Sequence, residues 1–154
     1  MTDPYVVAIH VAPGSRLPMK SVDHVRAEAG LGLVGDRYHG SKHRHVTVQS
    51  RELLDEAAEI HGAPIPNAGT RRNLTISHGG IPTTPGSRLR IGDAELEVVR
   101  VAAPCKLLDD NLGPGAQKAL RRRAGTVFRV LTSGLIMVGD PVTGDLVPED
   151  PALF

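Results

Sequence analysis

Short stretches of alternating or continuously hydrophobic residues recur along the chain, and this pattern predicts β-strands. Residues 5–11 are rich in Val and Ile and predict a buried strand near the start of the fold. Residues 45–49 alternate short polar and β-branched side chains, which is typical of a half-buried strand. Further short strands are predicted over 73–76, 126–132, 135–138 and 145–147.

The segment 88–101 predicts a β-hairpin. Residues 88–91 and 94–101 flank the pair Gly92-Asp93, which suits a two-residue turn with glycine first. The second arm alternates, so we expect it to bury one face. The inward residues should be Leu96, Val98 and Val101, and the outward ones Glu95, Glu97 and Arg100.

One segment, residues 51–61, has the spacing of a long helix. Its apolar stripe consists of Leu53, Leu54, Ala57, Ala58 and Ile60. Ser50 stands at the N-cap position and Gly62 at the position of a terminating glycine. One or two shorter helices are predicted within 107–123, interrupted by Gly113-Pro114-Gly115. Many short strands with few helices predict a mainly β (α+β) fold, a small closed or partly open β-barrel.

Composition adds the number of domains and the frequency of turns. The 154 residues are 40% hydrophobic and 23% charged, which suits a single domain over 1–154 with one core. The 17 glycines and 12 prolines are scattered along the chain and therefore indicate frequent turns. We find no internal repeat, linker or low-complexity segment in the sequence.

Charge and cysteine content exclude several classes of protein. A formal net charge of +1 gives no global attraction to nucleic acid or to an anionic membrane. The single cysteine, Cys105, excludes an intramolecular disulfide. The N-terminus lacks the pattern of a secretory signal, and the apolar runs are far shorter than the ~20 residues of a membrane span. We therefore expect a soluble cytoplasmic protein that binds neither nucleic acid nor membrane.

The glycine-flanked segment 35–40 is the first candidate for binding chemistry. Glycines on both sides let the backbone turn sharply and approach a ligand closely. Asp36 and Arg37 within it could recognise a polar or anionic group. The alternative is that the same pair ties the loop to the barrel, with Asp36 capping a turn.

A second candidate, Arg71-Arg72-Asn73, lies at the entry to a predicted strand. Neighbouring side chains of a strand point to opposite faces, so at most one of the two arginines faces a given pocket. An inward arginine beside the Asn73 amide suits a phosphate and the edge of a heterocycle. Alternatively, both arginines are solvated at the surface.

The third candidate is Cys105, between Pro104 and Lys106, just beyond the end of a long predicted strand. A thiolate is a soft metal ligand and a sulfur nucleophile. Lys106 would favour that ionised form, whereas Asp109 and Asp110 would oppose it if they lie close. The alternative is a buried cysteine that acts as a small hydrophobic residue.

Two other polar clusters give weaker signals. The spacing of His39, His43 and His45 does not match a structural zinc site, so solvated histidines are the better interpretation. The basic residues between 118 and 123 have no interleaved aromatics and do not indicate a nucleic-acid surface. The sequence has no phosphate-binding loop, nucleophile elbow or dinucleotide fingerprint.

Taken in order, these motifs resemble the MOSC family, named for the C-terminal domain of molybdenum cofactor sulfurase. The resemblance runs from about residue 5 to residue 147. It rests on five segments, which are Gly32–Arg37, Arg71–Leu74, Gly86–Gly92, Pro104-Cys105 and Val130–Asp140. The chain looks like a short stand-alone member without the N-terminal domain of larger relatives. Many relatives have Glu-Asn where this chain has Arg72-Asn73.

The resemblance implies a β-barrel in which Cys105 is the central functional residue. It implies either that Cys105 is a ligand of molybdenum or that it carries sulfur delivered by a pyridoxal-phosphate-dependent desulfurase. Asp36, Arg37, Arg71 and Asn73 match motif positions near the cofactor pocket, and we add Arg72 and Lys106 as cofactor-binding candidates.

These expectations give three hypotheses for the function. The first is binding of the molybdenum cofactor through the Cys105 thiolate, with reduction of N-hydroxylated compounds or sulfur transfer as the chemistry. The second is a sulfur carrier that receives persulfide sulfur on Cys105. The third is a non-catalytic barrel that binds a small anion. The expected partners are molybdopterin and either a cysteine desulfurase or an external redox protein, while the substrate and the oligomeric state stay open.

Overall fold

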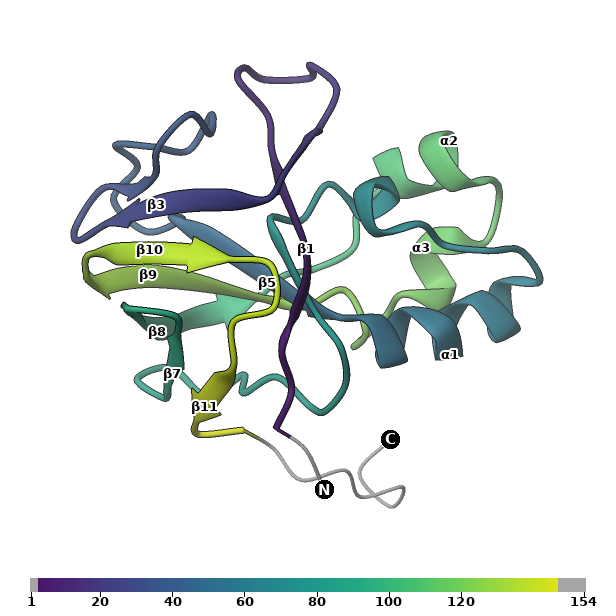
Figure 1. Cartoon of the computed structure of the whole chain (residues 1–154). Coiled ribbons are helices and arrows are strands. Elements are labelled where there is room, and N and C mark those ends of the chain that lie inside the picture. Colours follow the sequence, from purple (N-terminus) through teal and green to yellow (C-terminus); the bar gives the residue numbers. More distant parts are fainter. Residues whose placement is uncertain (1–2, 147–154) are drawn as a thin grey trace.

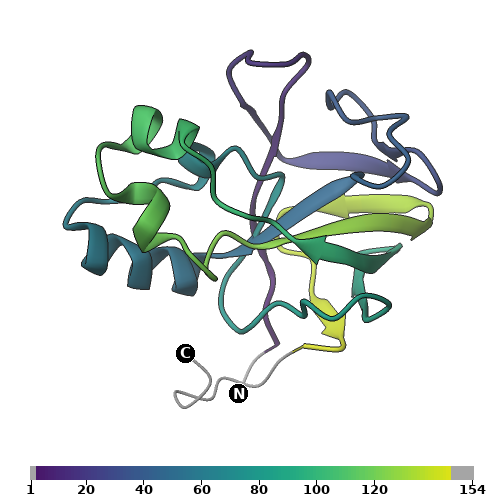
Figure 2. The same cartoon turned by 180° about the vertical axis from the view of Figure 1, so that it is seen from behind.

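The computed structural model describes residues 3–146. In this range the strands form one eight-stranded and one three-stranded sheet, and the helices gather at one side of the strands in both views (Figure 1 and Figure 2). The candidate site lies between the strands and the helices.

The larger sheet has the strand order β11-β7-β8-β9-β5-β6-β1-β2, and the smaller one has the order β10-β3-β4. The strands are β1 (Val6–Val11), β2 (Lys20–Val22), β3 (His24–Glu28), β4 (Gly32–Leu33), β5 (Val46–Ser50), β6 (Leu74–Ile76), β7 (Arg88–Ile91), β8 (Ala94–Val101), β9 (Thr126–Thr132), β10 (Gly134–Met137) and β11 (Val142–Gly144). The helices are α1 (Arg51–His61), the 3₁₀ turn η1 (Asn67–Thr70), α2 (Leu107–Leu112) and α3 (Ala116–Ala119).

One strand pair, β5 and β6, is parallel, and the other described pairs are antiparallel. A parallel pair needs a crossover connection, and α1 and η1 supply it here. This crossover brings the segment that follows η1, with Arg71 to Asn73, beside the start of β5.

Two apolar clusters hold the described part of the chain together. The larger lies among the strands, and Phe128, Ile9 and Leu96 are among its fully buried members. The smaller lies under the helices and includes Leu54 and Leu120. The strands and the helices are therefore each packed around an apolar cluster of their own.

The long helix confirms the sequence prediction at both ends. It runs over Arg51–His61 and buries Leu53, Leu54 and Ala57. Gly62 ends it with φ 83°, a left-handed conformation that glycine adopts without steric cost, and its N–H donates to the Ala58 carbonyl over 2.8 Å. Ser50 is at the N-cap, but its hydroxyl makes no capping hydrogen bond.

The predicted hairpin is also confirmed, with one correction. β7 pairs with β8 around Gly92-Asp93, and Leu96 and Val98 are buried. Val101 is 47% exposed, contrary to the predicted inward face. The β8–β9 register shifts between Val98 and Arg100, and such a bulge moves the following side chains to the other face.

The mainly β fold with a few helices is confirmed, but a closed barrel is not. Within residues 3–146 the end strands of the larger sheet, β11 and β2, are not paired with each other. The sequence did not predict β2, β3 or β4, because strands of two to five residues with few apolar positions give little periodic signal. The last described strand is Val142–Gly144 instead of 145–147, and residue 147 of that prediction lies outside the described residues.

The helices of the described region offer no candidate for crossing a bilayer, since each is too short or too polar.

Candidate functional site

Cys105 lies in the loop between β8 and α2, where its side chain is exposed and its neighbours are fixed. The N–H of Ala102 donates to the Gly125 carbonyl over 3.0 Å. The Gln117 amide donates to the Pro104 carbonyl over 3.3 Å, and the Leu108 N–H donates to the Cys105 carbonyl over 3.0 Å. The backbone around Cys105 is thus held from three sides, which presents an accessible thiol at a defined place.

Arg72 is the buried cation behind this loop. Its side chain donates from Nε to the Ala124 carbonyl over 2.9 Å and from Nη2 to the Ala103 carbonyl over 3.3 Å. Burial, together with the nearby charge of Arg44, lowers the pKa of Arg72 to about 10, and the negative charge of a Cys105 thiolate opposes that shift. Arg72 therefore fixes the loop and lies within electrostatic range of the thiol.

Asp36 and Asn73 form a buried hydrogen-bonded pair below the surface. The Asn73 amide nitrogen donates to Asp36 Oδ1 over 3.3 Å and to the His10 carbonyl over 3.1 Å. Its Oδ1 accepts from both the N–H and the hydroxyl of Thr47. Asp36 also accepts from the N–H of Ala12 over 3.0 Å. Both polar groups support the surrounding loops, so the predicted contact of Asp36 and Asn73 with a cofactor stays a prediction.

A cavity of about 400 Å³ opens beside this pair, and we call it the arginine pocket. Its lining residues come from the β1–β2 loop, the 35–40 loop, the turn before β6, and α2. They are Ser15, Arg16, Arg37, Tyr38, Arg71, Leu107 and Asn111. The pocket thus gathers predicted residues that are far apart in sequence, Arg37 and Arg71, and it reaches α2 just beyond Cys105.

Two arginines of the pocket have an unusual backbone conformation. Arg16 has φ 63° and Arg71 has φ 60°, in the left-handed region that non-glycine residues rarely adopt. Among the described residues, one further non-glycine residue, Arg122, has a positive φ. Such strain persists where the surrounding structure imposes it, and it is typical of functional sites.

Tyr38 stands between two guanidinium groups. The Arg37 guanidinium carbon lies 4.7 Å from the centre of its ring, and that of Arg44 lies 4.4 Å away. Both distances are those of cation–π contacts. Burial raises the pKa of Tyr38, but a hydrogen bond from Arg37 and the charges of Arg44 and Arg37 outweigh it, so the pKa is lowered overall.

The arginines around the pocket repel one another, and the charge of Asp36 offsets this repulsion only in part at Arg44 and Arg71. Burial and the charge of Arg37 lower the pKa of Arg71, and burial is also the main cause of a lowered pKa at Arg44. Within residues 3–146, the buried Arg71 Nη2 and Arg44 Nε have no hydrogen-bond partner. A bound anion would supply the missing acceptors and relieve the repulsion.

The remaining predicted residues lie at the edge of this arrangement. Lys106 is exposed at the start of α2, beside Cys105. Arg71 lines the pocket while Arg72 is buried behind it, in agreement with the expectation that at most one of them faces a given pocket. They diverge because Arg71 ends η1 in a left-handed turn and not, as predicted, because they alternate on a strand.

The histidines of the 35–45 loop do not gather around a common point. His39 contacts Glu28 over 2.8 Å, and His45 is buried with both ring nitrogens engaged. Over residues 3–146, no three His, Cys, Asp or Glu side chains come close enough together to hold a metal ion. Any metal ligand at the site would therefore come from Cys105 together with a cofactor's own donors.

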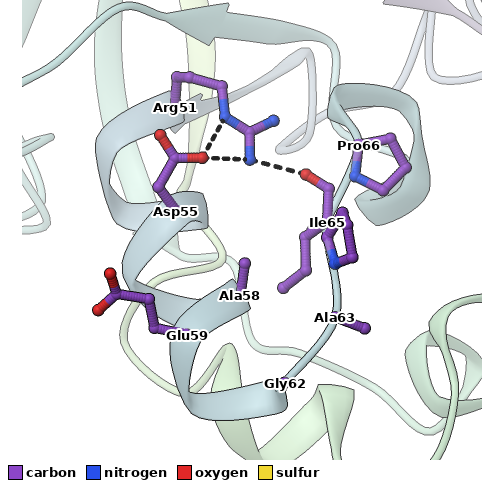
Figure 3. A pocket seen from close by; sticks show the side chains of 9 residues that line it. Arg51, Asp55, Ala58, Glu59, Gly62, Ala63, Ile65 and Pro66 are labelled. Carbon is purple, nitrogen blue, oxygen red and sulfur yellow. Dashed lines mark hydrogen bonds and ion pairs between the residues drawn. The ribbon is translucent and has the colours of Figure 1, made fainter.

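A second hollow, of about 790 Å³, lies beside α1 and shares no lining residue with the arginine pocket. Figure 3 shows that its one cation, Arg51, is bonded to Asp55 and to the Ile65 carbonyl, at 3.0 and 2.7 Å. Asp55 and Glu59 are the acidic groups of its lining, which otherwise consists of Gly, Ala, Pro and Ile. With its cation engaged and no nucleophile in the lining, this hollow is the weaker candidate.

Sequence reasoning missed several groups at the site, namely Arg16, Tyr38, Arg44 and Asn111. Tyr38 and Arg44 are close to residues that were identified, and Arg16 follows the turn at Pro13-Gly14. No periodic pattern marks them, because loops bring them together. The Gly35–Gly40 segment was the available signal, since a tight loop that presents Arg37 also presents its neighbour.

The fold and site define a mainly β domain that holds an exposed thiol beside an arginine-lined pocket. The family model described as MOSC domain matches residues 35–143, which contain every predicted site residue. The chain belongs to the MOSC domain family. This family is associated with the molybdenum cofactor. No curated protein sequence matches the chain.

Solved structures agree with this fold. YuaD of Bacillus subtilis has a TM-score of 0.77 at 20% identity, over 90% of this chain and 94% of that protein. YiiM of Geobacillus stearothermophilus has a TM-score of 0.73 at 21% identity, over 94% and 75%. YiiM of Escherichia coli has a TM-score of 0.66 at 19% identity, over 95% and 71%. At these identities the likeness establishes the fold.

The chemistry of the site fits such a cofactor. Molybdenum is held by soft sulfur donors, and Cys105 offers an accessible thiol. The cofactor also has a phosphate, and Arg71, which lines the pocket and has an unpartnered Nη2, is a suitable donor for one.

Proposed function

We propose that this chain binds a molybdenum cofactor, with the Cys105 thiolate as the protein's ligand to the metal. The observation that supports this most strongly is an exposed thiol two residues before Leu107, which lines the pocket together with three arginines. An ordinary structural cysteine would be buried as a small hydrophobic residue.

The arginines would hold the anionic part of the cofactor. Arg37 and Arg71 line the pocket and are suited to the phosphate, while Arg72 fixes the loop that presents Cys105. Lys106, exposed beside the thiol, adds a positive charge next to the proposed metal ligand. Asp36 and Asn73 keep the Arg37 loop in place, and whether they also contact the pterin edge is part of the proposal.

A bound molybdenum cofactor supplies two-electron redox chemistry. We assign to this chain the reduction of an N-hydroxylated compound, with electrons from an external redox protein. Described residues of the pocket provide guanidinium, hydroxyl and amide groups that would orient a small polar substrate.

Sulfur transfer is the second candidate, and the exposure of Cys105 favours it specifically. A carrier must accept sulfur from one protein and pass it to another, which requires a thiol at the surface. In that reaction the Cys105 thiolate attacks the outer sulfur of a desulfurase persulfide, and the desulfurase cysteine leaves as its thiolate.

The test is to purify the chain from a molybdenum-replete host and to measure bound molybdenum and pterin. We expect stoichiometric molybdenum in the wild type and its loss in Cys105→Ala, with an unchanged melting temperature because the side chain is exposed. A matched control is Arg88→Gln, which removes an exposed arginine on β7, away from the lining of the pocket.

The alternatives give other results. A chain without molybdenum that gains about 32 Da on Cys105 after incubation with a desulfurase, the mass of one sulfur atom, supports the carrier. Absence of both, with phosphate still bound, supports a non-catalytic anion-binding domain. Either result would contradict the proposal of a molybdenum-binding chain.

A further inference from the structure

Among the described residues that line the arginine pocket, Tyr38 alone has a side chain that exchanges a proton under ordinary conditions. The lining residues are three arginines, one serine, one leucine, one asparagine and Tyr38. Arginine does not deprotonate in practice, and serine and asparagine are far too weak as acids. No carboxylate or histidine belongs to this lining, and the nearby Asp36 is buried and engaged by three donors.

The geometry around Tyr38 favours an exchange of protons. Guanidinium groups lie over its ring from Arg37 and from Arg44, so a negative charge on the phenol would face two cations. The phenol lines the cavity in which a ligand would lie. An acid–base group needs both a stabilised ionised form and access to its partner, and Tyr38 has both.

We propose that Tyr38 is the acid–base residue of the arginine pocket, and that it donates its phenolic proton to an oxygen atom of the bound substrate. The inference deepens the proposed function, because the substrate class is that of the proposed reduction, an N-hydroxylated compound.

The proton balance of the reduction requires such a group. Cleavage of an N–O bond by two electrons takes up two protons, and it releases water and leaves an N–H bond. The electrons come from the external redox protein, one proton comes from the Tyr38 hydroxyl, and the second comes from solvent. The Tyr38 phenolate then takes a proton from water and returns to its starting state.

Charged groups on every side of Tyr38 act on its ionisation. Arg37 and Arg44 contact the ring, and Arg71 and Arg72 interact with it electrostatically. Asp36 is the one acidic group that acts against ionisation, and its charge is weaker in effect than those of the arginines. The arginines therefore favour phenolate, in agreement with a lowered pKa of Tyr38.

The first test follows tyrosine ionisation by ultraviolet absorbance in the metal-free protein. The chain has two tyrosines and no tryptophan, so Tyr5→Phe leaves Tyr38 as the sole absorbing phenol. In Tyr5→Phe we expect Tyr38 to ionise below the ordinary tyrosine pKa of about 10. Adding Arg44→Gln to this variant should move the ionisation of Tyr38 back towards that value. An ordinary or raised transition in Tyr5→Phe would overturn the proposal.

The second test places Tyr38 against a ligand without any need for molybdenum. Inorganic phosphate is the probe, because a bound anion disfavours the nearby phenolate. We expect phosphate to move the Tyr38 transition of Tyr5→Phe to higher pH, and Arg71→Gln to abolish that movement. A transition that saturating phosphate leaves unchanged would show that Tyr38 does not face the bound ligand, which would overturn the proposal.

The third test uses the loaded protein. For an N-hydroxylated substrate we expect Tyr38→Phe to lower kcat about 100-fold with little change in KM, and Tyr5→Phe to keep both. Unchanged kcat and an unchanged pH profile in Tyr38→Phe would contradict the assignment. If the wild type takes up no cofactor, the proposed function fails. The first two tests still decide whether Tyr38 ionises below its ordinary pKa and whether it faces a bound anion.

Discussion

At the scale of single residues, the site contains side chains that hydrogen-bond its loops together and side chains that line its cavity. Asn73 and Asp36 use their polar atoms to join β1, β5 and the 35–40 loop. Arg37, Arg71 and Tyr38 line the cavity instead. Motif positions that look equivalent in the sequence therefore have different tasks, and mutations should separate stability from binding.

Asn73→Ala tests the supporting role. The substitution removes the amide that accepts from the buried Thr47 hydroxyl and donates to the Asp36 carboxylate and the His10 carbonyl. We expect the free energy of unfolding, measured by urea denaturation, to fall by about 3 kcal/mol. Asn111→Ala, which changes an exposed amide on α2, should stay within about 0.5 kcal/mol of the wild type. Equal losses in the two variants would refute the assignment.

Several site residues could be predicted from the sequence, but the arginines that loops bring beside them could not. Asp36, Arg37, Arg71 and Cys105 stand in motifs with recognisable neighbours. Arg16 comes to the pocket by way of the β1–β2 loop. Arg44 reaches the ring of Tyr38 from the same loop region. Contacts of this kind depend on loop conformation, which has no period in the sequence.

At the scale of elements, the sequence predicts a helix or a hairpin correctly where its local residue pattern alone determines the structure. The hairpin around Gly92-Asp93 and the helix Arg51–His61 were predicted with correct bounds, because turn residues and a regular apolar stripe specify them. β3 was missed because its outward residues are charged and its inward ones are only two, Val25 and Ala27. β3 forms because it pairs with β10, which lies far away in the sequence, and the local sequence alone does not show this.

Gly62→Ala tests the termination of α1. Gly62 has φ 83°, and a Cβ there would meet nothing within 4 Å, so the cost is conformational strain alone. We expect a loss of about 1 kcal/mol in the free energy of unfolding. The control Glu59→Ala changes an exposed position of the same helix and should have little effect. An unchanged stability in Gly62→Ala would mean that the helix does not need a left-handed residue at its end.

At the scale of the whole molecule, the buried His45 fixes the loop that precedes β5. His45 Nε2 donates to the Ser41 carbonyl over 2.7 Å, and Nδ1 accepts from the Val130 N–H over 2.9 Å. This pattern requires a neutral ring, and burial lowers the pKa of His45. The 35–45 loop is thereby tied to β9, and the arginine pocket depends on that loop.

Stability should therefore depend on pH. An unfolded His45 takes up a proton near pH 6.5, whereas the folded one does so only at lower pH, so stability is complete above about 6.5 and falls with pH below it. Urea midpoints measured between about pH 8 and pH 5 should show this fall. His45→Gln should reduce this dependence of the urea midpoint on pH, whereas His43→Gln, at an exposed position, should leave it unchanged. The dependence that remains in His45→Gln comes from His10, whose pKa is also lowered by burial. The same slope in both variants would contradict this account.

The central claim is that Cys105 is the protein's ligand to molybdenum, and X-ray absorption at the molybdenum edge tests it most directly. The wild type and Cys105→Ser would be loaded with cofactor and compared for the number of sulfur neighbours of the metal. We predict that the wild type has one more sulfur neighbour than the variant, because the thiolate is replaced by a hydroxyl. The same number of sulfur neighbours in both proteins would contradict the claim.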